Sequence, residues 1–188
     1  MLAKTVMAGV TIVALTASSS RGASPDYDSY LAPDSVCPAD DLPMATAERM
    51  SVMMCLIDYA RATRGLARLP RVPQLSSSAR LKAGLIVRCD EFDHRACGRP
   101  MQESFEQAGY MTGYATWEVG ESLAYGVGML GRPRAVLRAW LRSDRHRANL
   151  LDSDWEAQGI AVRQPGALFG LRDNSLWVSH FGRRDVSP

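Results

Sequence analysis

The amino-acid sequence predicts an α+β domain in which helices cover a central sheet. Apolar residues recur at helical spacing over most of the first two thirds of the chain, and two clear strand-like segments, 159–163 and 176–181, come late. Helices combined with strands that gather toward the end of a chain are typical of a mixed domain with one sheet. The length of 188 residues suits one such domain with short appendages.

The N-terminal residues have the three-part pattern of an export signal. Lys4 supplies a positive charge, an apolar run follows over 5–17, and small and polar residues lead to Ala23. The apolar run is too short to span a bilayer comfortably, and an uncleaved anchor is the alternative. We therefore expect a signal peptide at 1–23, a secreted, extracellular protein and no transmembrane segment beyond the signal.

The charge balance argues against a nucleic-acid partner. The chain has 22 basic and 20 acidic residues, and residues 1–23 contain Lys4 and Arg21 but no acid. The remainder of the chain is therefore neutral overall, whereas nucleic-acid binding draws on a basic excess that attracts phosphates. We expect no nucleic-acid partner and a monomeric protein.

Residues 24–44 are expected to form a mobile linker rich in proline and aspartate. This segment contains four prolines and five aspartates, a composition typical of irregular chain. Cys37 is the one residue in it that could attach the segment to the domain. The domain itself is expected over 45–183, with a tail at 184–188.

The four cysteines are expected to form disulfides, because thiols oxidise outside the cytosol. Four cysteines allow three pairings. Cys89 and Cys97 enclose a short loop, whereas Cys37 precedes the first expected helix and Cys55 lies within it. Local closure favours Cys37–Cys55 and Cys89–Cys97. A zinc cluster is the alternative, which the lack of a Cys-x-x-Cys pair disfavours.

Four helices and one further extended segment complete the expected elements. The first helix begins near Thr46, which suits the N-cap position, and ends before Gly65. The others are expected at about 75–89, between Pro100 and Gly109, and from Pro133 onward, with an extended segment at 116–124. The last of these helices carries a basic stripe that we expect to face solvent, formed by Arg134, Arg138 and Arg142.

Two short motifs match known patterns incompletely. Residues 126–131 have the glycine spacing of a dinucleotide-binding loop, but Asp152, the acid at the required distance, does not follow a strand. Residues 120–124 begin like the nucleophile turn of serine hydrolases, but Ala124 replaces the last glycine of that pattern. We expect neither activity.

Three further motifs come in a distinctive order. The chain carries Phe92-Asp93-His94, then Gly120-Glu121, then Trp140-Leu141-Arg142-Ser143-Asp144-Arg145-His146-Arg147-Ala148-Asn149-Leu150-Leu151. In these motifs the chain resembles bacterial secreted members of the CAP superfamily, the cysteine-rich secretory protein, antigen 5 and pathogenesis-related-1 group, whose shared unit is the SCP domain. Members typically carry an aromatic-x-His, a Gly-Glu-Asn and a Trp-x-x-Ser-x-x-His-Arg-x-Asn motif. The resemblance covers about 48–182.

The resemblance implies a three-layer α-β-α sandwich with a central, mostly antiparallel sheet. It also implies a cleft that gathers His94, Glu121 and His146, with Asp144 as a possible further acid. Ser122 departs from the family pattern, because it replaces the usual asparagine. His180 lies outside the family's usual positions, and we expect it to be a bystander to the cleft.

This residue set is compatible with more than one function. Two imidazoles and a carboxylate can bind a divalent, zinc-like metal and leave a position open, act as a general base with a partner, or form a hydrogen-bonded cluster that ties loops together. The family is better known for binding than for a shared reaction. We therefore expect a binding module for a metal, a small apolar ligand or a cell-envelope component. The alternative is a metal-dependent, peptidase-like hydrolase with Glu121 as base.

Overall fold

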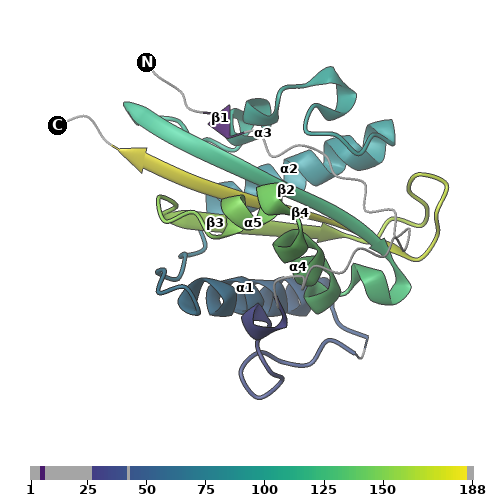
Figure 1. Cartoon of the computed structure of the whole chain (residues 1–188). Coiled ribbons are helices and arrows are strands. Elements are labelled where there is room, and N and C mark those ends of the chain that lie inside the picture. The colour runs from purple at the N-terminus through teal and green to yellow at the C-terminus, as the bar shows by residue number, and fades with distance from the viewer. Residues whose placement is uncertain (1–4, 7–26, 42, 186–188) are drawn as a thin grey trace.

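The computed structural model describes residues 5–6, 27–41 and 43–185. Four strands form one sheet in the order β1-β2-β4-β3 (Figure 1). Their bounds are Thr5–Val6 for β1, Thr116–Val127 for β2, Ala157–Arg163 for β3 and Asn174–Asp185 for β4. β2 and β3 both pair antiparallel with β4, whereas β1 pairs parallel with β2.

Helices cover both faces of the sheet and produce a three-layer α-β-α sandwich (Figure 1). One face packs against α2, Pro73–Cys89, and α3, Met101–Gln107. The other face packs against α1, Thr46–Ala62, α4, Pro133–Arg142, and α5, Asp144–Leu150. The predicted α+β sandwich with a mostly antiparallel sheet is confirmed.

The alternation of side chains along β4 divides the core into two parts. Trp177 and Phe181 pack with α1 and α4, whereas Leu176 and Val178 pack with α2. His180 shares the α2 face with Val178. The described residues of the three buried apolar clusters lie between Tyr27 and Phe181, in the helices, in β2, β3 and β4 and in the loops between them.

The expected element bounds hold within a few residues, with two corrections. Helix α1 begins at Thr46, but Ala45 occupies the N-cap position and no side chain bonds the helix end, so the expected threonine cap is wrong by one position. Residues 126–131 form the end of β2 and a short 3-10 helix, Gly128–Gly131. A Cβ atom on Gly126 would clash with the Leu130 and Gly131 backbone, so close packing explains that glycine without a nucleotide.

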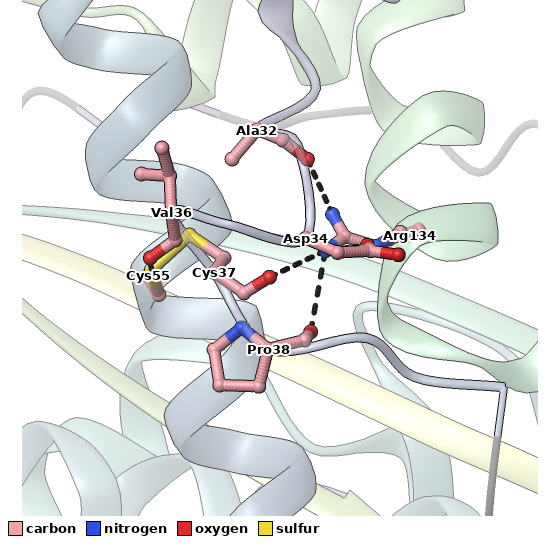
Figure 2. Close-up of a disulfide and its surroundings, with 7 residues drawn as sticks. All are labelled: Ala32, Asp34, Val36, Cys37, Pro38, Cys55 and Arg134. Carbon is pink, nitrogen blue, oxygen red and sulfur yellow. Dashed lines mark hydrogen bonds and ion pairs between the residues drawn. A yellow bond between two sulfur atoms is a disulfide. The ribbon is translucent and has the colours of Figure 1, made fainter.

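The segment expected to be a mobile linker is packed on α1 and α4. Figure 2 shows Arg134 of α4 among the main-chain carbonyls of this segment. Its guanidinium donates to the carbonyls of Ala32 at 2.6 Å and Cys37 at 2.6 Å, and it pairs with Asp34 Oδ1 at 2.6 Å. The expectation of mobility is therefore wrong for residues 27–41, which we call the N-terminal strap. Residues 24–26 and 42 lie outside the described part of the chain.

The strap also corrects the expected solvent-facing arginine stripe. The Arg134 side chain is only 17% exposed, and Arg138 pairs with Asp28 of the strap at 3.0 Å. Arg142 is exposed as expected, and the paired Arg138 side chain is still 41% exposed. The helix pattern could not indicate this, because the acceptors for Arg134 are mainly carbonyls, which every residue carries.

Both predicted disulfides are confirmed. Cys37–Cys55 attaches the strap to α1, with Cα atoms 5.7 Å apart, as Figure 2 shows. Cys89–Cys97 closes the loop after α2, with Cα atoms 5.6 Å apart. The short sequence separations of 18 and 8 residues explain why local closure found the right pairing.

We predict that Arg134→Ala lowers the free energy of unfolding by about 2–3 kcal/mol, because several carbonyls in a half-buried interface lose a charged donor. Urea unfolding followed by circular dichroism measures this. Arg142→Ala on the same helix is the matched control, and we expect it to change the free energy by less than about 0.5 kcal/mol. Equal effects of the two substitutions would show that the strap contributes nothing to stability.

Candidate functional site

A buried carboxylate on β2 lies at the centre of the candidate site. Glu121 pairs directly across the sheet with His180 of β4 and has no exposed surface. Its Oε1 atom lies 2.6 Å from His94 Nδ1, and its Oε2 atom lies 2.8 Å from His180 Nε2. Both carboxylate oxygens are therefore bonded to imidazoles.

The contact between Glu121 and His180 corrects the expectation that His180 is a bystander. Its ring is fully buried, stacks on Phe105 with ring centres 4.1 Å apart, and places Nδ1 2.7 Å from Ser78 Oγ. The alternation of side chains along β4 correctly predicts that His180 shares a face of the sheet with Val178. Its partner could not be predicted, because the register that brings Glu121 opposite His180 joins positions 59 residues apart.

Ser78, His180 and Glu121 have the connectivity of a hydrolase triad but cannot act as one. In such a triad the serine hydroxyl must reach a substrate carbonyl. Here all three residues have no exposed surface, and Ser78 lies inside α2, where its hydroxyl also lies 2.9 Å from the Leu75 carbonyl. The three residues are therefore a structural hydrogen-bond chain that leads from α2 to Glu121.

Lys82 completes the buried polar cluster. Its ammonium group donates to the main-chain carbonyl of His94 and lies 3.9 Å from Glu121 Oε1. Burial lowers the pKa of Lys82, and the nearby charges of Glu121 and Asp93 oppose this effect. The sequence offers a signal for this residue in retrospect, since a lysine at the helical spacing of Ala79, Ala83 and Ile86 must enter the core with them.

The cluster stabilises the ionised form of Glu121. Burial raises the pKa of Glu121, but the hydrogen bonds from His180 and His94, aided by Lys82, outweigh it and lower the pKa to about 2. Burial lowers the pKa of His180, so that this ring is neutral at pH 7. A neutral His180 donates from Nε2 to the carboxylate and accepts a hydrogen bond from the Ser78 hydroxyl at Nδ1.

His94 is held in one orientation by this arrangement. It lies in the loop that Cys89–Cys97 closes, its carbonyl accepts from Lys82, and its Nδ1–H donates to Glu121. The other ring nitrogen, Nε2, takes no part in this hydrogen bond. This atom is buried and has no hydrogen-bond partner among the described residues. An imidazole backed by a carboxylate is the usual form of a histidine that binds a metal.

His146 approaches from the opposite helical layer. It lies on α5, is 5% exposed, and lines a pocket of about 200 Å³ that follows β2. Burial, followed by the charge of His94, lowers the pKa of His146 to about 4, so this ring is neutral at pH 7. The remainder of the pocket is apolar, with the largest side chains being Phe92, Leu123, Tyr125, Leu130 and Trp140.

The expected site residues are not all brought together. Asp144 is 91% exposed and pairs with Arg147 at 2.6 Å. Glu121 lies behind His94, with both of its oxygens bonded. Over the described residues, the structure contains no group of three or more His, Cys, Asp or Glu side chains arranged to hold a metal ion.

Ser122 makes a structural contact on the other face of β2. Asn149 of α5 donates from Nδ2 to the Ser122 hydroxyl at 2.9 Å, and its carbonyl accepts from the Trp155 indole at 2.8 Å. Arg147 likewise bonds the Leu141 carbonyl at 2.8 Å. These two residues of the long motif therefore hold the helices in place and do not point to a ligand.

The sandwich, with His94 and Glu121 on one side of β2 and His146 on the other, defines a domain of the SCP type. A sequence profile of the cysteine-rich secretory protein family, CAP, matches residues 55–181. The chain belongs to this family. The resemblance inferred from its motifs is thereby confirmed.

Individual proteins are also similar to this chain. The uncharacterized protein YkwD of Bacillus subtilis (strain 168) is 29% identical over 130 residues, which are 67% of this chain and 44% of that protein. The chain thus matches less than half of that relative's length. The solved structure of an outer surface protein from Borrelia burgdorferi has a TM-score of 0.63 at 21% identity, over 76% of this chain and 97% of that one.

A second solved structure, an extracellular protein with an SCP domain from Bacillus anthracis, has a TM-score of 0.56 at 18% identity. The similarity covers 76% of this chain and 45% of that one. These solved relatives are described as outer-surface or extracellular proteins. In the portion of the chain that the structure describes, no helix is long and apolar enough to cross a membrane.

We predict that acidification destabilises the metal-free protein through His146. Its pKa lies near 4 in the folded state and near 6.5 when unfolded, so between these values the unfolded chain binds a proton that the folded chain does not. Stability therefore falls by about 2–3 kcal/mol as the pH drops from 7 to about 4.5. Urea unfolding in EDTA measures the change, and His146→Gln should lose this part of it. An unchanged pH dependence in the variant would contradict the assignment.

We also predict that Glu121 fixes the proton on His94, because its carboxylate can only accept at Nδ1. Two-dimensional ¹⁵N–¹H spectra of the imidazoles should show the neutral His94 ring with its proton at Nδ1. Glu121→Gln replaces the carboxylate by an amide that can donate or accept, and it should give His94 a mixture of tautomers. Ser122→Ala, on the opposite face of β2, is the control and should leave the His94 spectrum unchanged. The chain has only three histidines, so the assignment is direct.

Proposed function

We propose that the chain is an exported binding domain, with residues 1–23 as its export signal, and that His94 and His146 form the polar part of its binding site. The observation that carries this proposal is His94 Nε2, a buried nitrogen on a ring that Glu121 orients and that no described residue engages. A buried polar atom without a partner costs about 1–3 kcal/mol. A ligand that engages this atom would recover that cost.

The donor atoms suit a divalent metal of the zinc type. Imidazole nitrogens are ligands that zinc favours, and the carboxylate behind His94 would raise the basicity of that ring. We assign His94 and His146 as the ligands and Glu121 as the residue that orients His94. The described residues supply no third ligand, so further positions would be filled by water or by the bound molecule.

The apolar part of the site suits an uncharged organic group. The side chains around the pocket are mostly aromatic or aliphatic, and the imidazole of His146 in its lining is neutral at pH 7. A ligand that combines a polar group near the histidines with an apolar group in the pocket would satisfy both parts. A component of the cell envelope is consistent with the outer-surface and extracellular descriptions of the relatives.

The geometry favours binding over hydrolysis. A general base must lie within hydrogen-bond reach of the water or group that it deprotonates. Glu121, the expected base, has no exposed surface and accepts hydrogen bonds at both oxygens. Asp144, the other candidate acid, is directed to solvent and paired with Arg147. Neither carboxylate is available to a water molecule in the pocket.

Isothermal titration of the metal-free protein with Zn²⁺ tests the proposal. We expect binding by the unsubstituted chain, a loss of at least about 100-fold in affinity for His94→Ala and His146→Ala, and a loss of about 10–100-fold for Glu121→Gln. Circular dichroism confirms that each variant is folded. Asp144→Asn is the control and should bind as the unsubstituted chain does. Absence of zinc binding, or equal affinity in all variants, would remove the two histidines as a metal site.

A further inference from the structure

The strand beside the candidate site presents main-chain groups that β4 does not use. In an antiparallel pair, every second residue directs its N–H and C=O toward the partner strand, and the residues between direct theirs away. The Leu123 carbonyl accepts the Trp140 indole N–H at 3.0 Å, so the main chain of Leu123 points away from β4. By the same alternation, the main-chain groups of Val119, Glu121 and Tyr125 also point to the outer edge of β2.

This outer edge already pairs with an extended segment. Thr5 and Val6 form β1, a parallel partner opposite Val119 and Gly120. Because Val119 and Glu121 point outward, Val6 is the residue of β1 whose own N–H and C=O face them. Within the described residues, the pairing ends at Val6, and the Glu121 carbonyl and the Leu123 N–H lie next along the edge in the same register.

The binding site lies directly beyond this pairing. The pocket begins at Leu123, follows the strand to Val127, and is closed on one side by Trp140. His94 reaches Glu121 from one face of the sheet, and His146 lines the pocket from the other. An extended segment that continues past β1 would therefore enter between the two histidines and meet the apolar pocket after about two or three residues.

We infer that the ligand of this site is an extended peptide segment with an apolar side chain, added as a parallel strand to the outer edge of β2. This inference rests on the proposed binding function and specifies its ligand class. Main-chain hydrogen bonds to residues 119–123 would hold the segment, and one apolar side chain would fill the pocket. The Trp140 indole ends the strand pairing, because it occupies the Leu123 carbonyl.

The test uses a synthetic peptide with the sequence of residues 4–13 and the chain 24–188, which contains every described residue of the three buried clusters. Circular dichroism first verifies that this chain is folded. Fluorescence anisotropy of the labelled peptide should show binding at least about tenfold tighter to the chain 24–188 than to the full chain, in which Thr5 and Val6 occupy the edge.

Backbone methylation separates strand pairing from non-specific contact. In the register of β1, the N–H groups at Val6 and Ala8 of the peptide face β2, whereas those at Thr5 and Met7 face away. We expect N-methylation at Val6 and Ala8 to weaken binding at least about tenfold and N-methylation at Thr5 and Met7 to change it less than about threefold. Equal losses for both peptides, or binding no tighter than that of a scrambled peptide, would overturn the inference.

A protein variant tests the pocket independently. Ala139→Trp should fill the pocket and weaken peptide binding at least about tenfold, whereas Ala148→Trp, on the exposed surface of α5, should leave it unchanged. Equal losses of peptide affinity in the two variants would show that the pocket does not hold a side chain of the peptide. Concentration-dependent dimers in sedimentation, dissolved by the peptide, would overturn the inference in favour of a second copy at this edge.

The two levels of the proposal fail separately. Zinc binding that depends on His94 and His146 would leave the binding site in place even if peptide binding showed no difference between the two N-methylated peptides, and that result would remove the peptide inference. Peptide binding that is weakened only by N-methylation at Val6 and Ala8, without zinc binding, would support the strand pairing and remove the metal.

Discussion

The ionised carboxylate of Glu121, buried between two imidazoles, is the contact on which the site and much of the fold depend. An unpaired charge in the core is strongly destabilising, so the carboxylate must be bonded on all sides. Its partners come from three separate parts of the chain: the loop after α2 through His94, strand β4 through His180 and helix α2 through Lys82. One side chain therefore joins the sheet, the helical layer above it and the loop of the site.

Strand β2 contacts both helical layers, because successive side chains alternate between its two faces. Glu121 meets α2 on one face, and the next residue, Ser122, bonds Asn149 of α5 on the other. The loop that carries His94 and the helix that carries His146 are thus fixed to neighbouring residues of a single strand. This explains how two histidines from opposite layers come to lie beside the same strand edge.

Patterns that are local in sequence predicted most of this molecule, and contacts between distant segments account for the differences. Helical and alternating spacing located the helices and the late strands, and short separations identified both disulfides. The pairing of His180 with Glu121 depends on strand register, which no local pattern encodes. The strap depends on carbonyl acceptors for Arg134, which any sequence would offer. The motifs that contain His94 and His146 are specific, whereas Ser78 and Lys82 lie in an ordinary helical pattern.

The supports of His94 act on different degrees of freedom, and this difference explains why its site is suited to binding. The Cys89–Cys97 bond limits the backbone of the loop, and the Lys82 contact holds the carbonyl, but neither restrains the ring. Glu121 does so, because a hydrogen bond at Nδ1 sets both the orientation of the ring and the nitrogen that carries the proton. A ring fixed in this way loses little conformational entropy when a ligand engages it. Because both oxygens of the same carboxylate accept hydrogen bonds from histidines, Glu121 is not free to take a proton from a bound molecule. The contact that orients His94 therefore also prevents Glu121 from acting as a general base.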